Sequence, residues 1–410
     1  MSTLRQDADG IIRRAVAAVL PDAAVKTALR EKKLTGAVWV VAAGKAAWRM
    51  ACAAREELGG QIRGGIVITK YGHDRGPIEP LEIYEAGHPV PDENSFAATA
   101  RAMELVRGLG TEDTVLFLLS GGGSALFESP LVDGAELADI TGQLLRCGAD
   151  IVEINTLRKR LSAVKGGRFA RLCAPARVFS VVLSDIVGDP LDMIASGPAC
   201  PDSSSCADAR AVAARYGLRL SEKARACLDA ETPKELDNVE TVITGSVTRL
   251  CAAARDAASE LGYEPILLSD RLTGEAREAG RYLAAEACRY SGKGRRVALI
   301  AGGETVVHVT GQGLGGRSQE LVLAAAIDIE GLPDVAVFSV GSDGTDGPTD
   351  AAGGYADGAT AQRLRGLGRP AEDYLADNDS YHALSESGGL IITGPTGTNV
   401  NDLTVALIRG

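Results

Sequence analysis

Several side chains that can hold an anion stand directly after apolar stretches of the sequence, and Lys45 is the first of them. It follows Val38–Ala43 and Gly44 and precedes an Ala-rich segment at helical spacing. A lysine at that place can bind a phosphate as a point charge, while the start of the following helix supplies backbone N–H donors. The segment is not a P-loop, because Trp39 stands where the first glycine is required and Ala46 where a serine or threonine is required.

A second candidate is the glycine-rich turn Ser120-Gly121-Gly122-Gly123-Ser124, which follows the apolar run Val115–Leu119. Consecutive glycines lose much conformational entropy on folding, and such a cost is expected where the backbone must approach another group closely. The turn therefore favours a binding loop, with a plain strand-to-helix turn as the alternative. A serine hydrolase is disfavoured, since a nucleophile elbow on Ser124 requires glycine where Leu126 stands.

The third candidate stretch runs from residue 302 to residue 320 and contains Glu304, a predicted strand Thr305–Thr310, four glycines within residues 311–316, and Arg317. Arginine makes bidentate contacts with phosphate, so an arginine at the expected start of a helix indicates an anion site. The glycines also match the dinucleotide pattern G-x-G-x-x-G. The acid that should end the next strand about 20 residues later is missing, however, which makes that reading weak. A glycine-rich turn without a ligand is the remaining alternative.

Two loops that follow predicted strands are rich in aspartate. One contains Asp185 and Asp189, and the other contains Asp343, Asp346 and Asp350. Carboxylates of this kind suit Mg²⁺ carried with a nucleotide, or a base that takes a proton from a hydroxyl group. Aspartate and glycine also form ordinary turns, so each loop has a purely structural alternative.

A basic segment, residues 155–168, contains five Lys and Arg residues in a chain of net negative charge. We expect a helix there, with Leu157, Leu161 and Val164 on the apolar face and Lys165 on an adjacent face. A solvated helix face is the simpler interpretation. The glycine pair at positions 166 and 167 favours anion contact.

Composition limits the classes of function. The 410 residues include 43 Lys and Arg against 54 Asp and Glu, giving a net charge of −11, which predicts no nucleic-acid or acidic-lipid surface. The eight cysteines form no C-x-x-C pair, so zinc and redox motifs are disfavoured and a reducing cytoplasm is expected. Neither a signal peptide nor an apolar run of about 18 residues is recognisable.

The elements that must position these side chains alternate between short apolar runs and Ala-rich helical segments. This pattern predicts an α/β protein of two domains, residues 1–236 and 237–410, each a mostly parallel sheet flanked by helices, with the first domain Rossmann-like. Ligands of such sheets bind outside the carboxyl ends of the strands, where all the candidate residues stand. We therefore expect the active site in a cleft between the two domains.

Seven short strings of the sequence resemble the glycerate 2-kinase family, whose members have a DUF4147 N-terminal region and a MOFRL C-terminal region. The resemblance covers nearly the whole chain, and the last two strings are highly specific together. The strings are Ala43–Ala47, Leu119–Ala125, Ile194–Pro198, Gly302–Thr305, Gly315–Leu321, Asp343–Ala351 and Thr393–Leu403. The chain departs from the family at Ser318, where many relatives carry asparagine.

The resemblance implies ATP-dependent phosphorylation of D-glycerate at its 2-hydroxyl group, with Mg²⁺. It assigns the roles of catalytic cations to Lys45 and Arg317. We hypothesise that Asp189 orients or deprotonates the hydroxyl and that Asp185 and Asp346 place the metal. The turn Ser120–Ser124, with Lys165 and Glu304, is expected to bind the nucleotide.

Two alternatives remain at this point. Some relatives carry the name hydroxypyruvate reductase, which together with the glycine pattern raises an NAD(P)H-dependent enzyme. The other is a non-catalytic module that binds a sugar acid or a nucleotide. The sequence does not decide between a monomer and a homodimer.

Overall fold

The computed structural model describes residues 3–184 and 191–410. The chain divides into two compact units, one formed by Pro21–Thr244 and the other by Met1–Leu20 together with Gly245–Gly410. The sequence placed a boundary between residues 236 and 237. The units instead part after Thr244, and the first helix of the chain belongs with the C-terminal half.

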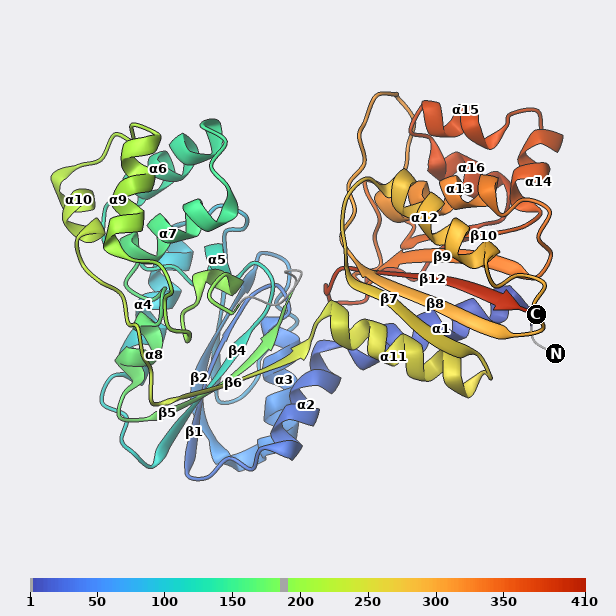
Figure 1. Ribbon diagram of the computed structural model, residues 1–410. Coiled ribbons are helices and arrows are strands. Elements are labelled where there is room, and N and C mark those ends of the chain that lie inside the picture. The colour runs from blue at the N-terminus through green and yellow to red at the C-terminus, as the bar shows by residue number, and fades with distance from the viewer. Residues whose placement is uncertain (1–2, 185–190) are drawn as a thin grey trace. The chain divides into compact units, whose positions relative to one another are not determined.

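The Pro21–Thr244 unit is built on a six-stranded sheet of order β3-β2-β1-β4-β5-β6 (Figure 1). β3, β2, β1, β4 and β5 run parallel to their neighbours, so their carboxyl ends share one edge of the sheet. The strands are β1 (Ala37–Ala43), β2 (Ile62–Lys70), β3 (Leu81–Ala86), β4 (Asp113–Leu119), β5 (Arg177–Leu183) and β6 (Val239–Gly245).

Helices cover both faces of this sheet. One face packs against α2 (Pro21–Glu31) and α3 (Ala47–Leu58), and the other against α4 (Glu93–Val106) and α8 (Arg168–Cys173). The strands alternate to serve both layers, since Val40 of β1 faces the first and Val41 the second. This unit also has three short elements, the helix α5 (Gly123–Leu126) and the 3₁₀ turns η1 (Gly59–Gln61) and η2 (Ile194–Ser196).

A separate cluster of four helices has its own apolar core within the same unit. Its members are α6 (Gly134–Arg146), α7 (Ile151–Leu161), α9 (Cys206–Arg215) and α10 (Glu222–Leu228). The sequence analysis expected one helix over residues 155–168. That prediction was wrong, because α7 ends at Leu161 and α8 begins at Arg168, with Gly166 and Gly167 between them at positive φ.

The second unit also has a six-stranded sheet, of order β11-β10-β9-β12-β8-β7. Its strands are β7 (Glu264–Leu272), β8 (Arg296–Gly303), β9 (Val335–Gly341), β10 (Gly353–Asp357), β11 (Leu390–Ile391) and β12 (Asp402–Arg409). The α/β class is confirmed, but this sheet is mixed rather than mostly parallel. Strand β12 inserts antiparallel between β8 and β9, and β10 pairs antiparallel with β9.

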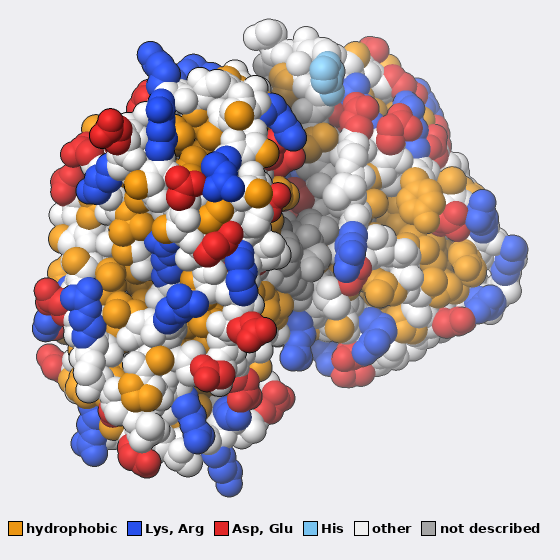
Figure 2. Space-filling model, turned by 60° about the vertical axis from the view of Figure 1, so that its left-hand side comes forward, with side chains coloured by type: hydrophobic (Ala, Val, Ile, Leu, Met, Phe, Trp, Pro, Cys, Tyr) orange, Lys and Arg blue, Asp and Glu red, His pale blue; other side chains and the backbone are white. Residues whose placement is uncertain are grey.

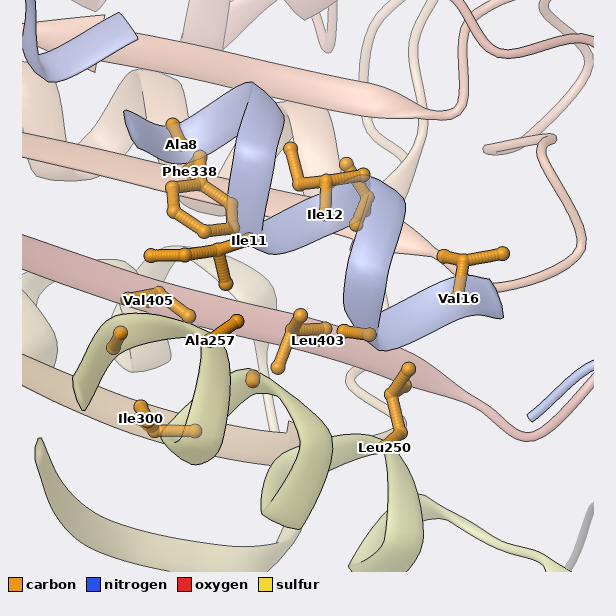
Figure 3. Close-up of a cluster of buried hydrophobic side chains, with 14 of the residues drawn as sticks. Ala8, Ile11, Ile12, Val16, Leu250, Ala257, Ile300, Phe338, Leu403 and Val405 are labelled. Carbon is orange, nitrogen blue, oxygen red and sulfur yellow. The ribbon is translucent and has the colours of Figure 1, made fainter. Parts of the chain in front are cut away.

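Helices again cover both faces of the second sheet. α12 (Ala276–Cys288) and α13 (Arg317–Asp328) pack on one face, and α11 (Val247–Glu260) packs on the other beside α1 (Leu4–Ala18). Figure 3 shows Ile11, Ile12 and Val16 of α1 in the same buried cluster as Leu403 and Val405 of β12. α1 belongs to this unit because its buried side chains are part of the apolar core formed with α11 and the second sheet. The remaining helices are α14 (Thr360–Gly366), α15 (Ala371–Ala376) and α16 (Ser380–Glu386).

The surface carries charges of both signs, and Figure 2 shows basic side chains interspersed with acidic ones over the visible face. This mixture agrees with the modest net charge of −11. Within residues 3–184 and 191–410, none of the helices is both long enough and apolar enough to cross a membrane.

Candidate active site

The glycine turn Ser120–Ser124 leaves the carboxyl end of β4 and is fastened to the neighbouring turn after β1. The Ser120 hydroxyl oxygen accepts the Ala46 N–H at 3.1 Å, and the Lys45 N–H donates to the Gly121 carbonyl at 2.9 Å. Gly122 has φ +88°, a conformation that favours glycine. The two turns therefore form one rigid unit at the edge of the sheet where the sequence predicted ligand binding.

Lys45 is exposed beside this turn, and the structure adds basic side chains that the sequence analysis did not select. A ring nitrogen of His73, Nδ1, lies 3.0 Å from the Lys45 carbonyl oxygen. Burial, followed by the charges of Lys45, Lys70 and His73, lowers the pKa of His88. Each of these residues stands at or just after the end of a strand. Their positions at strand ends can be read from the sequence, but only the strand order shows that β1, β2 and β3 bring these basic side chains together.

Lys165 lies beneath the glycine turn and is completely buried. Its ammonium donates to the carbonyl oxygens of Ser124, Phe127 and Ala195, at 2.8, 3.1 and 3.4 Å. The carboxylate of Glu128 is 3.5 Å away, and burial lowers the pKa of Lys165. This geometry favours a structural role, in which Lys165 holds the shape of the turn from inside.

Asp185 and Asp189, the predicted metal ligand and base of this unit, lie outside the described residues.

In the second unit, Arg317 begins α13, as the sequence predicted, and it is held by two carboxylates. Its Nε and Nη2 donate to both oxygens of Asp402 at 2.6 and 3.0 Å, and Nη1 donates to Glu304 at 2.7 Å. Burial raises the pKa of Asp402 to about 6, although Arg317 acts in the opposite direction. Glu304 sits at the carboxyl end of β8 with its side chain about half exposed. Asp402, which the sequence analysis did not select, is therefore part of the Arg317 site.

The glycines before Arg317 serve packing. A Cβ on Gly311 would come within 2.2 Å of the Asp377 carbonyl oxygen, and one on Gly313 within 2.4 Å of Asp379 Cβ. The N–H groups of this loop are used internally: those of Thr310 and Gly311 donate to the Asn378 side chain, and those of Gln312, Gly313 and Leu314 donate to Asp377 or Asp379. A dinucleotide loop instead requires its N–H groups to face the pyrophosphate. The loop thus places Arg317.

The predicted strand Thr305–Thr310 is not a strand. Only an isolated bridge between Val306 and Glu275 forms in that segment of the described chain.

Asp346, predicted as a metal ligand, is 4% exposed and caps α13. One carboxylate oxygen accepts the Ser318 N–H at 3.1 Å and the other accepts the Gln319 N–H at 2.8 Å. Burial raises its pKa. Mg²⁺ prefers accessible carboxylates and water, which this environment does not offer. No group of three or more His, Cys, Asp or Glu side chains in the described part of the chain is arranged to hold a metal ion.

Comparison of the sequence with known proteins places this chain in a family. A model described as a domain of unknown function (DUF4147) matches residues 7–229, and a model of the MOFRL family matches residues 297–402. A relative from Thermotoga maritima named D-glycerate 2-kinase is 54% identical over 99% of both chains. The chain belongs to the glycerate 2-kinase family.

Structural comparison agrees with this assignment. A crystal structure of glycerate kinase from Thermotoga maritima superposes on the chain with a TM-score of 0.96, at 54% identity and 99% coverage of both chains. A relative from Agrobacterium vitis, 41% identical over 98% of this chain and 94% of its own, carries a provisional hydroxypyruvate reductase name. This name is the one that led the sequence analysis to keep a reductase as an alternative.

Proposed function

We propose that this protein is a D-glycerate 2-kinase, which transfers the γ-phosphoryl group of ATP to the 2-hydroxyl of D-glycerate. A bond forms between the 2-oxygen and the γ-phosphorus while the bond from that phosphorus to the bridging oxygen of ADP breaks, and the hydroxyl proton leaves to a base. The products are 2-phosphoglycerate and ADP. The observation that carries the proposal is the 54% identity to D-glycerate 2-kinase over 99% of both chains.

Phosphoryl transfer depends mainly on positioning and on stabilising the charge of the transferred group. We assign this stabilising role to the positive charges of Lys45, which is exposed beside the glycine turn, and of Arg317, which Asp402 orients. The turn Ser120–Ser124 supplies a close approach for the phosphates, and Lys165 supports it from beneath. When an anion arrives, Arg317 can exchange its contact with Glu304 for a contact with that anion.

Mg²⁺ would neutralise the phosphate oxygens of ATP. We keep Asp185 as its proposed ligand and Asp189 as the proposed base, while the buried, helix-capping carboxylate of Asp346 does not fit a metal ligand.

The reductase alternative requires a nicotinamide cofactor, and the loop that matched the dinucleotide pattern uses its N–H groups internally. Two assays compare the functions directly. We expect ADP release from ATP, Mg²⁺ and D-glycerate, and no NAD(P)H oxidation with hydroxypyruvate. Activity in the second assay alone would overturn the kinase proposal, and silence in both with tight ligand binding would favour a binding module.

The site assignments have their own test. We expect Lys45→Ala and Arg317→Ala each to lower kcat/KM by roughly 10³-fold, the scale of a lost charge contact to a transferring phosphoryl group. The exposed residues Lys293 and Arg13 provide matched controls, since Lys293→Ala and Arg13→Ala remove a charge of the same kind elsewhere. A site variant that keeps the kcat/KM of its control would remove that residue from the mechanism.

A further inference from the structure

Three neighbouring parallel strands end in basic residues at one place. Lys45 follows β1 after Gly44, Lys70 is the last residue of β2, and His88 follows β3 after Gly87. Lys70 is paired in register with Ala86, the last residue of β3. Because β1 and β3 lie on either side of β2, the sheet places these three residues along one edge, next to the turn after β4.

Two of these side chains, His88 and Lys45, meet at Gly122. A Cβ on Gly122 would lie 3.0 Å from Cδ2 and 3.1 Å from Nε2 of His88, and 3.3 Å from Cγ of Lys45. The imidazole and the lysine stem therefore both cover the backbone of the glycine turn. This contact places His88 at the same turn to which we assign the phosphates.

Basic side chains act on the His88 imidazole, while the carboxylate of Asp92 lies against the backbone of the preceding residue, Gly87. The side chains that act on the imidazole are Lys45, Lys70 and His73, all of them basic. In the described part of the chain no carboxylate forms an ion pair with Lys45, Lys70 or His88. Like charges gathered beside a glycine turn repel one another, and an anion bound among them removes that repulsion.

We propose that His88, together with Lys70, is a further binding residue of this site and contacts an oxyanion of the reactants. The oxyanion is a nucleotide phosphate or the carboxylate of D-glycerate, and both present the same chemistry to an imidazole N–H and an ammonium group. This inference rests on the proposed kinase function for the identity of the ligands. It rests on the geometry alone for the existence of an anion site.

Isothermal titration of the full-length protein separates the two sources. ADP is titrated into the wild type, His88→Ala, His88→Gln and Lys70→Met, and D-glycerate is then titrated into each with ADP present. Losing a hydrogen bond to a charged group should raise one dissociation constant roughly ten- to a hundred-fold in His88→Ala. His88→Gln retains an N–H donor and should be less affected. Lys33→Met, which alters an exposed lysine before the opposite end of β1, is the control.

A selective change for ADP assigns the phosphate, and a selective change for D-glycerate assigns the carboxylate. The proposal is overturned if both dissociation constants of His88→Ala stay within about threefold of the control, and also if only kcat falls. Histidine ring NMR signals of the wild type give a second readout that needs no folded variant other than His88→Gln for assignment. We expect the His88 signal to move on addition of the ligand, and a signal that does not move contradicts the proposal.

The kinase assay is run separately on the same samples. Binding that depends on His88 without turnover would overturn the proposed function and leave the anion site standing. Turnover combined with binding that does not depend on His88 would overturn the His88 anion site and leave the proposed function standing.

Discussion

Asp402 holds Arg317 through both carboxylate oxygens, at 2.6 Å to Nε and 3.0 Å to Nη2. A bidentate pair fixes the plane of a guanidinium group as well as its position. The Nη1 atom points to Glu304, a partly exposed side chain. An incoming anion would therefore meet a cation whose orientation is already set.

The first prediction tests this orientation. Asp402→Asn keeps the size of the side chain but replaces one acceptor oxygen by a donor, so Arg317 loses half of its bidentate contact. We expect kcat/KM for ATP-dependent phosphorylation of D-glycerate to fall roughly 10- to 100-fold, by analogy with other misplaced catalytic groups. Asp357→Asn, which weakens the exposed pair with Arg363, should leave the rate unchanged. Equal rates in the two variants would contradict a positioning role.

The second prediction concerns pH. The pKa of Asp402 is about 6 in the folded protein, above its ordinary value of 3.8, chiefly because of burial. The stability that its neutral form contributes is complete below the unfolded pKa and is lost as the pH rises through about 6. We expect the free energy of unfolding of the wild type, relative to Asp402→Asn, to fall by about 1 kcal/mol between about pH 5 and about pH 7. Urea unfolding measures this difference, and a rise over that range would refute the assignment.

The third prediction concerns Lys165. Lys165→Met removes the donor for three carbonyl groups and the ion-pair partner of the buried Glu128 carboxylate. We expect the free energy of unfolding to fall by about 3–5 kcal/mol, and Glu128→Gln in the same chain to restore part of it. Lys223→Met alters an exposed lysine of α10 and should change little. A stable Lys165→Met protein that fails only to bind ATP would instead support direct ligand contact.

The fourth prediction compares two glycines of similar backbone conformation. Gly122 has φ +88° and Gly148 has φ +73°, but only Gly122 has neighbours where a Cβ would stand. Alanine at either position should cost about 1–2 kcal/mol in the free energy of unfolding because of backbone strain. Gly122→Ala should also displace His88 or Lys45 and raise the KM for ATP or for D-glycerate, whereas Gly148→Ala should not. Identical kinetics in both variants would separate the turn from substrate binding.

Local signals in the sequence predicted individual elements well. The run Val115–Leu119 became β4, and Arg317 begins a helix as expected. The β-branched residues of Thr305–Thr310 also predicted a strand. Among the described residues, however, this segment pairs only through an isolated bridge at Val306, and Asn378 accepts the N–H groups at its end. Strand propensity describes a side chain that suits a sheet, and it does not supply the neighbouring strand.

Long-range pairing was the part that the sequence did not reveal. The antiparallel entry of β12 between β8 and β9 brings Asp402 to Arg317, 85 positions away in the sequence. Likewise, the order β3-β2-β1-β4 brings His88 to Gly122. Neither relationship follows from spacing or composition, because each depends on which strands are neighbours in space.

The sheet of the second unit has a consequence for synthesis of the chain. Its β12 is made after β8 and β9, yet it lies between them, and α1, which is made before all three, packs against it. The apolar face of α1 packs against α11, β9 and β12, so its packing is complete only after Asp402–Arg409 has been made, whereas the strands of Pro21–Thr244 are made much earlier. In a nascent chain stalled before Asp402, the Pro21–Thr244 unit could fold completely, while the other unit would still lack β12.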